Sequence, residues 1–218
     1  MFRAGAGVLH GLNKMENILI PVSYFPPLSC FLLIIKNQNI CFELFEHFPK
    51  QTFRNRCSIY SPNGIQQMVI PLHDRKDKTI TKDIRISYEQ KWQTLHWRSL
   101  ESAYRSSPYF EYYEDDFKPL YEKKFDFLAD FNLEIMQVVF SLMKMKREIS
   151  FTKEYEKVPG DKKDCRDVLN KKNIPPVKFP RYAQVFENRH GFIYNLSIAD
   201  LLFNQGNEAK DYLREITG

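Results

Sequence analysis

The chain has 218 residues, with 32 Lys or Arg and 27 Asp or Glu, so its formal net charge at pH 7 is +5. Hydrophobic residues make up 43% of the chain, which suffices for a packed core and excludes wholesale disorder. The charge is too close to balance for a protein that coats nucleic acid, so we expect no nucleic-acid partner.

The N-terminal end differs in composition from the rest of the chain. Of the 8 glycines, Gly5, Gly7 and Gly11 lie within residues 1–14. No apolar run with a small-residue cleavage site follows, so a secretory signal is not predicted. We interpret residues 1–14 as a flexible leader, left by an upstream start codon, with Met15 as the natural start. Residues 15–218 are expected to form a single domain.

The remaining glycines and the cysteines exclude several kinds of site. No two of these glycines have the spacing of a dinucleotide-binding or P-loop turn, in which clustered glycines let backbone amides approach phosphate. The cysteines form no CxxC and no zinc-ligand spacing with His, so we predict no metal site. A metal requirement and the cofactor stay open. The residues in question are Gly64, Gly160, Gly191, Gly206, Gly218, Cys30, Cys41, Cys57 and Cys165.

The same features indicate where the protein works. No secretory signal accompanies the cysteines, and reduced thiols fit a cytoplasmic protein. The longest apolar run, Cys30–Ile35, is far too short to span a bilayer, so no integral membrane segment is predicted.

Strands are predicted to dominate up to about residue 90. Apolar and β-prone runs predict strands at 17–22, 39–45, 56–60, 66–71 and 83–87, with a short helix at 28–35. Asn63-Gly64 lies between two of the strands and predicts a hairpin, because both residues tolerate positive φ.

Helices are predicted to follow. Ser87 and Gln90 have the spacing of a capping box, which predicts a helix through about Arg105. Apolar residues at helical spacing predict one long helix from 117 to 145. Residues 152–180 are charged and interrupted by proline, which indicates an exposed connector. The tail is predicted to hold a strand at 182–186 and helices at 197–204 and 208–216, separated by Gly206.

These elements favour one fold class. A strand–helix–strand unit over residues 17–45 predicts a parallel pair of strands, whereas the hairpin requires an antiparallel part. The helices would bury their apolar faces on the sheet. We therefore predict a single α/β domain with a mixed β-sheet packed by helices, and α+β is the alternative.

The first polar cluster follows the second predicted strand. Lys50, Arg54 and Arg56 could hold a carboxylate or phosphate, since the arginine guanidinium presents a bidentate pair of donors. Asn55 would lie on the apolar face of the strand, where its amide needs partners. The alternative is an edge strand with solvated basic side chains.

The second cluster lies on the helix predicted to start near Ser87. A catalytic interpretation uses His96 as a general base, Glu101 to orient it, and Arg98 and Arg105 to hold an anion. The alternative is a hydrogen-bonded core histidine beside ordinary surface ion pairs.

The third cluster lies near the C-terminus. His190 precedes a glycine in a predicted loop, where an exposed histidine could act in catalysis. Asn195, Ser197 and Asp200 favour capping of helix N-terminal amides over catalysis.

Four segments together resemble the WbqC-like protein family: IPVSYFPPLSCF (20–31), HFPKQTFRNRC (47–57), WQTLHWRSLESAYRSSPYFEYY (92–113) and NLSIADLLFNQGNEA (195–209). One departure is Cys30, where an aromatic residue is expected before Phe31. The resemblance implies a bacterial protein of surface polysaccharide synthesis, of the O-antigen type, with a suggested transfer of glycine or a similar acyl group to a sugar. It carries over no catalytic set. It adds weight to the matching positions Tyr24, Lys50, Arg54, Asn55, Arg56, His96, Arg98, Glu101, Tyr104 and Arg105.

Two hypotheses follow. The first is a cytoplasmic transferase with an activated sugar or aminoacyl donor as its partner, in which His96 or His190 accepts the proton and the arginines bind the anion. The alternative is a non-catalytic binding or assembly protein of a polysaccharide-synthesis complex, which predicts a flat apolar patch and no deep polar pocket. The sequence leaves the oligomeric state open.

Overall fold

The computed structural model describes residues 17–74, 78–170 and 177–217. The predicted leader, residues 1–14, lies outside the described residues. Within them, one hydrophobic core runs from the first strand to the last helix.

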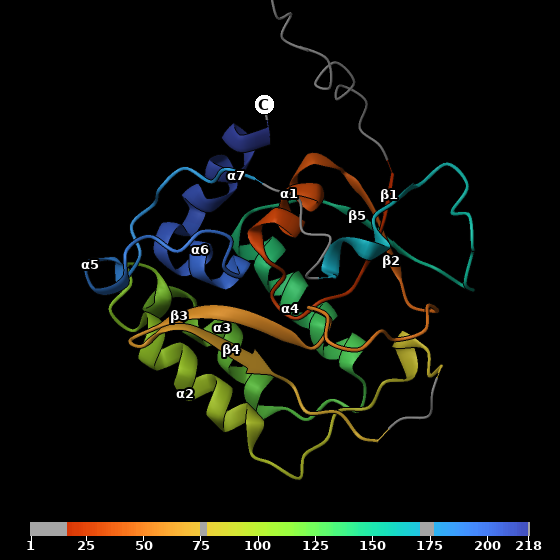
Figure 1. Ribbon diagram of the computed structural model, residues 1–218, viewed down its shortest axis with the longest axis horizontal. Coiled ribbons are helices and arrows are strands. Elements are labelled where there is room, and N and C mark those ends of the chain that lie inside the picture. The colour runs from red at the N-terminus through yellow and green to blue at the C-terminus, as the bar shows by residue number, and fades with distance from the viewer. Residues whose placement is uncertain (1–16, 75–77, 171–176, 218) are drawn as a thin grey trace, which may run out of the picture.

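Four strands form a parallel sheet in the order β5-β2-β1-β6 (Figure 1). β1 pairs with β2 on one side and with β6 on the other, and β5 joins the free edge of β2. The strands are Ile18–Pro21 (β1), Asn39–Glu43 (β2), Glu148–Phe151 (β5) and Lys163–Asp164 (β6). The predicted parallel pair near the N-terminus is thus the centre of the sheet.

Helix α1, Leu28–Lys36, connects β1 to β2 and is apolar on nearly every side, which suits a helix buried between the sheet and other helices. The backbone carbonyls at its C-terminal end accept hydrogen bonds from two side chains. The Asn37 side-chain amide donates to the carbonyl of Leu33 at 2.8 Å. The Arg147 guanidinium donates to the carbonyls of Ile34 and Ile35. A cation and an amide thus occupy the end where helix carbonyls lack partners.

The predicted hairpin is confirmed. β3, Arg56–Ser61, and β4, Gly64–Val69, pair antiparallel in a sheet of their own. Gly64 has φ +93°, a backbone angle that glycine tolerates and that residues with a side chain rarely adopt. The α/β class is therefore confirmed, with the parallel and antiparallel parts in two separate sheets.

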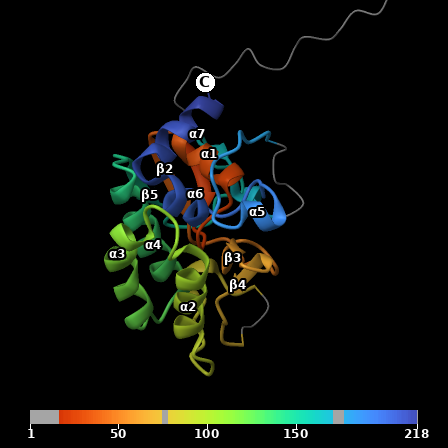
Figure 2. The same ribbon diagram turned by 90° about the vertical axis from the view of Figure 1, so that its left-hand side faces the viewer.

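Three helices follow the hairpin in the chain and pack in succession, with α2 against the hairpin. α2 contacts α3 and β3, and α3 contacts α4. Figure 2 shows the hairpin and α2 at the end of the molecule opposite α7. The helices are Trp92–Tyr104 (α2), Phe110–Glu122 (α3) and Leu128–Leu142 (α4).

The predicted start of α2 is wrong. The helix begins at Trp92, and no side chain caps its N-terminus. The Ser87 hydroxyl instead accepts a long 3.5 Å hydrogen bond from the amide of Glu89. The capping-box spacing of Ser87 and Gln90 therefore does not mark the start of the helix.

The single helix predicted over 117–145 is also wrong, because the chain turns between α3 and α4. The backbone is extended at Lys123 and at Phe127. Phe127 forms an isolated bridge with Arg85, whose guanidinium lies over the Phe127 ring. The apolar spacing continues through the break because both helices face the same core, so periodicity could not reveal the break.

Two short strands predicted at 83–87 and 182–186 do not form. Ile84 and Ile86 are buried on either side of exposed Arg85, as the alternation predicts, but the segment makes only isolated bridges. The segment with Tyr182 is irregular, and its polar side chains bind Asp200.

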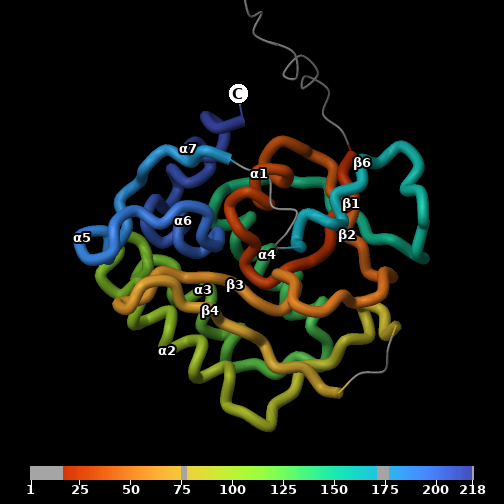
Figure 3. The backbone as a smooth tube through the Cα atoms, in the orientation of Figure 1, coloured from red at the N-terminus to blue at the C-terminus, as the bar shows by residue number. Residues whose placement is uncertain are grey.

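The C-terminal part holds α5, α6 and α7, and α6 begins after Ser197 and ends at Gly206 as predicted. The predicted capping by Ser197 and Asp200 is wrong, because the Ser197 hydroxyl makes no cap hydrogen bond and the Asp200 carboxylate binds side chains instead of helix amides. The predicted connector at 152–180 is exposed over 153–158, but it also carries β6 and a short 3-10 helix that packs inward. Figure 3 shows the loop between β5 and β6 projecting beside the sheet. The bounds are Glu187–His190 (α5), Ile198–Gln205 (α6), Ala209–Thr217 (α7), and the 3-10 helices Thr81–Asp83, Arg166–Leu169 and Gly206–Glu208.

Substitution of Gly206 by alanine should destabilise the fold. Gly206 has φ +54°, and a Cβ there would lie 2.4 Å from the Tyr109 ring. We expect Gly206→Ala to lower the free energy of unfolding by about 1–3 kcal/mol more than Gly160→Ala, a control at φ +64° with nothing within 4 Å. Urea unfolding of both variants measures this, and equal losses would contradict the packing account.

Candidate functional site

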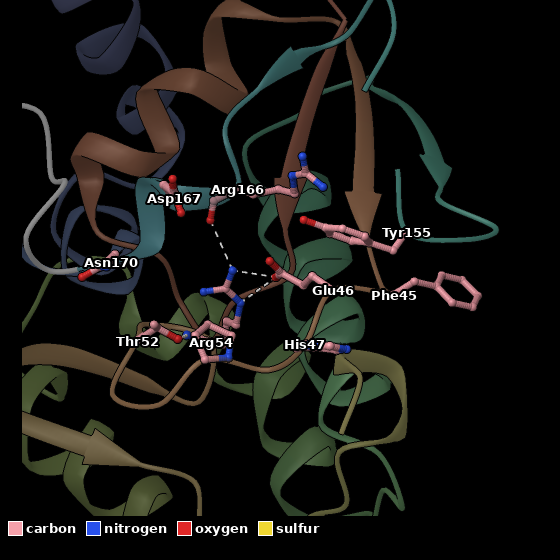
Figure 4. Close-up of a pocket in the computed structure, with 10 residues that line it drawn as sticks. Phe45, Glu46, His47, Thr52, Arg54, Tyr155, Arg166, Asp167 and Asn170 are labelled. Atoms are coloured by element: carbon pink, nitrogen blue, oxygen red, sulfur yellow. Dashed lines mark hydrogen bonds and ion pairs between the residues drawn. The ribbon is translucent and has the colours of Figure 1, made fainter. Parts of the chain in front are cut away.

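A pocket of about 360 Å³ lies at the carboxyl ends of the parallel strands (Figure 4). The segments that follow β2, β5 and β6 all contribute to its walls. In open α/β sheets, ligands bind at this end of the strands. The lining residues are Phe45, Glu46, His47, Pro49, Thr52, Arg54, Tyr155, Arg166, Asp167 and Asn170.

Arg54 lies at the centre of the pocket wall and is only 3% exposed. Its Nε and Nη2 donate to Oε1 of Glu46 at 2.8 and 2.6 Å, and Nη2 also donates to the carbonyl of Arg166 at 3.2 Å. Among the described residues, none accepts a hydrogen bond from Nη1. The backbone on either side is fixed, because Asn132 donates to the Arg54 carbonyl and the Phe53 amide donates to Leu169.

Glu46 completes the pair and keeps one oxygen available. Both Arg54 hydrogen bonds end on Oε1, and in the described part of the chain no group donates to Oε2. Burial raises the pKa of the Glu46 carboxyl, although the Arg54 guanidinium acts in the opposite direction. Nη1 of Arg54 and Oε2 of Glu46 are thus a donor atom and an acceptor oxygen without a hydrogen-bond partner among the described residues.

Arg166 organises the neighbouring wall, and each nitrogen of its guanidinium makes hydrogen bonds. It pairs with Asp164 and with Glu43, which ends β2 and is completely buried. It also donates to the backbone carbonyls of Glu156 and Lys157. Its guanidinium lies 5.0 Å from the centre of the Tyr155 ring. Arg166 therefore holds the segment after β5 against the pocket, and its guanidinium is not available to a ligand.

Carboxylates in and next to the pocket outnumber its arginines. Two arginines and two carboxylates line it, and Arg166 has two further carboxylate partners, Asp164 and Glu43. A pyrophosphate would meet more negative charge here than the two arginines offset. The pocket suits a neutral or zwitterionic group better than a polyanion.

In many parallel-sheet proteins a phosphate binds at the N-terminus of the helix after the first strand. In this chain, other backbone and side-chain groups bind the amides at that position. At the N-terminus of α1, the amide of Leu28 donates to the carbonyl of Leu196, and the amide of Ser29 donates to Oδ1 of Asn195. These amides would otherwise face a phosphate group. Asn195 was predicted to cap a helix, and it caps α1 rather than α6.

The first predicted cluster divides in the structure. Arg54 enters the pocket, whereas Lys50 is exposed and does not line it. Asn55 is buried and donates to the carbonyl of Ile70, so its amide is satisfied at the end of the hairpin. Arg56 begins β3 and has a buried Nε without a hydrogen-bond partner.

The second cluster divides between the interior and the surface. His96 is buried, and its Nδ1 is 3.1 Å from the hydroxyl of Tyr24, which also bonds the Tyr121 hydroxyl at 2.7 Å. Burial lowers the pKa of His96 from 6.5 to about 4, although the Val69 carbonyl opposes this. Neither Tyr24 nor His96 lines the pocket.

The remaining residues of that cluster do not meet His96. Glu101 pairs with Arg105, which also pairs with Glu114 on the surface. Arg98 is exposed. Tyr104 is buried, and its hydroxyl donates to Asp200 at 2.9 Å.

The polar side chains of the third cluster form hydrogen bonds with other parts of the fold. His190 is exposed, and its Nε2 lies 2.9 Å from the carbonyl of Pro62. Asp200 is fully buried and accepts hydrogen bonds from Tyr104, Tyr182 and Gln184. Burial raises the pKa of Asp200, against these three donors. The three clusters therefore do not share one pocket.

Four pocket residues that matter for its chemistry were not among the predicted site residues: Glu46, His47, Tyr155 and Arg166. Glu46 directly precedes the first cluster and follows a predicted strand, so the carboxyl end of that strand was a usable signal. Tyr155 and Arg166 lay in the presumed connector and carried no such signal.

Two kinds of feature are absent from the part of the chain that the structure describes. No three side chains of His, Cys, Asp or Glu are grouped there as a metal ion requires. In the same residues, no helix combines the length and the apolarity needed to cross a membrane.

Comparison with known proteins gives one family. The sequence model of the WbqC-like protein family matches residues 22–174, a range that includes the whole pocket. The uncharacterized protein Rv1507c of Mycobacterium tuberculosis is 24% identical over 199 residues, which cover 77% of this chain and 84% of that protein. No solved structure matches.

The buried His96 should make stability depend on pH. Its pKa is about 4 in the folded chain and near 6.5 when exposed, so the unfolded chain binds the proton first as the pH falls. The stabilisation is complete above pH 6.5 and is lost towards pH 4, by up to about 3 kcal/mol. Urea unfolding at pH 7 and pH 4.5 measures the free energy of unfolding of the wild type and of His96→Gln. We expect this free energy to fall less between the two pH values in His96→Gln, and an equal fall in the wild type and the variant would contradict the prediction.

Proposed function

The chain belongs to the WbqC-like protein family, and from that premise we propose that it is a transferase of bacterial surface polysaccharide synthesis, of the O-antigen type. In this proposal it works in the cytoplasm and transfers glycine or another acyl group from an activated donor to a sugar. The observation that carries the proposal is the pocket, in which Arg54 and Glu46 each keep one polar atom without a partner among the described residues.

The charge balance of the pocket supports an aminoacyl group. A glycyl group carries an ammonium and a carbonyl oxygen. Oε2 of Glu46 accepts from the ammonium, and Nη1 of Arg54 donates to the carbonyl oxygen. Such a ligand brings no excess negative charge into a site that already holds two carboxylates.

His47 supplies the proton acceptor in this proposal, because it is the one histidine among the lining residues. The sugar oxygen forms its bond to the acyl carbon while its proton passes to His47. The bond between the acyl carbon and the leaving group of the donor breaks, and the leaving group carries away the electron pair. Arg54 stabilises the negative charge that develops on the carbonyl oxygen.

The roles predicted for His96, Glu101 and His190 are not part of this mechanism, because none of the three lines the pocket. Of the predicted binding residues, Arg54 is retained. The alternative of a non-catalytic assembly protein predicts no deep polar pocket, so a pocket lined by buried Arg54 and partly buried Glu46 supports the transferase.

Removal of the Glu46 charge should abolish function in cells. We expect Glu46→Gln to lower the glycine content of the surface polysaccharide at least about tenfold, because the ammonium loses its charged partner. The measurement is mass spectrometry of polysaccharide from a gene-deletion strain complemented with each variant. Glu101→Gln, which changes a surface carboxylate, should restore the wild-type level. Full restoration by Glu46→Gln would contradict the proposal.

Loss of the His47 imidazole should act on rate rather than on binding. We expect His47→Ala to lower kcat about 100- to 10,000-fold with little change in KM for the donor. The matched control is His73→Ala, at an exposed histidine that does not line the pocket. Steady-state kinetics of the purified proteins measures both, and an unchanged kcat in His47→Ala would exclude His47 as the proton acceptor.

A further inference from the structure

Strand β5 is an edge strand, and no strand of the described residues pairs with its outer side. It ends the order of the parallel sheet, and its four residues are all exposed. Two of them are large and apolar, with Ile149 37% and Phe151 46% exposed. Natural sheets cover or charge such edges, because an open edge pairs readily with another strand.

The hydrogen-bond pattern shows which backbone groups point outward. The amides of Glu148 and Thr152 donate to carbonyls of Gln38 and Phe42 on the β2 side. Because alternate residues of a strand point to opposite sides, the N–H and C=O groups of Ile149 and Phe151 point away from β2. No described residue pairs with them.

We propose that this edge pairs with the same edge of a second copy of the chain, antiparallel and with a twofold axis at Ser150. In that register Ile149 of each copy faces Phe151 of the other. Each of the two pairs exchanges both an N–H and a C=O hydrogen bond, so every outward backbone group of Ile149 and Phe151 is satisfied. The parallel sheets of two molecules then form one continuous sheet.

The side chains of β5 favour a second copy over an unrelated strand. The twofold axis places Ile149 and Phe151 in cross-strand contact twice, and such aromatic and β-branched pairs stabilise sheets. Two charge pairs flank the strand in this register. Lys146 of each copy lies near Glu154 of the other, an attractive pair. Lys153 lies near Arg147, but the Arg147 guanidinium is turned towards α1, where it donates to the carbonyls of Ile34 and Ile35.

The pairing also touches the pocket. Tyr155, which lines the pocket, directly follows Glu154 in the chain. A second copy at the edge therefore holds the start of the loop that carries this pocket wall.

A cysteine at the twofold axis tests the register. Ser150 of one copy faces Ser150 of the other without hydrogen bonds between them, and Cα atoms in such pairs are about 4.5 Å apart, within disulfide range. We expect Ser150→Cys to form a covalent dimer under mild oxidation. Ile149→Cys is the control, because each introduced cysteine would face Phe151. A cross-link in Ile149→Cys but not in Ser150→Cys would overturn the register.

The mass in solution tests the interface itself. We expect sedimentation velocity of the full chain to show a concentration-dependent dimer. Ile149→Pro removes only an amide that points away from β2, and it should raise the dissociation constant at least about tenfold. Circular dichroism checks that the variant is folded, and Ile149→Val should dimerise as the wild type does. A wild-type monomer, or a dimer unaffected by Ile149→Pro, would overturn the proposal.

Discussion

The ion pair between Arg54 and Glu46 is the constraint on which the candidate site depends. A guanidinium that is 3% exposed is stable only with charged and hydrogen-bonded partners. Glu46 and the carbonyl of Arg166 supply them, which joins the loop after β2 to the segment after β6. The same pairing leaves Nη1 and Oε2 open, so the interaction that fixes the pocket wall also gives it its chemistry.

The surrounding charges decide what kind of ligand the pocket accepts. Arg166 is committed to Asp164, Glu43 and two backbone carbonyls, so it shapes the wall without adding an available cation. At the N-terminus of α1, Asn195 takes the place that phosphates occupy in many parallel-sheet proteins. Both facts point away from a nucleotide and towards a small group without net negative charge.

Local patterns predicted much of the fold, whereas long-range contacts decided the rest. The buried β1–α1–β2 unit and the Asn63-Gly64 hairpin follow from short stretches of sequence. The break between α3 and α4 depends on a bridge from Phe127 to Arg85, which no local pattern contains. The spacing of basic residues singled out Arg54, but Arg166 joins the site only because β6 pairs with β1. His96 was predicted as a general base, with a hydrogen-bonded core histidine as the alternative, and its buried position outside the pocket agrees with the alternative.

The central claim is that a small aminoacyl-type ligand binds between Arg54 and Glu46. Arginine side-chain Nε–Hε signals in ¹⁵N NMR spectra test it most directly, with free glycine as the probe. The account predicts that glycine shifts the Arg54 signal and leaves those of the surface residues Arg98 and Arg105 in place. Shifts confined to those surface arginines, or no shift at Arg54 at saturating glycine, would contradict the account.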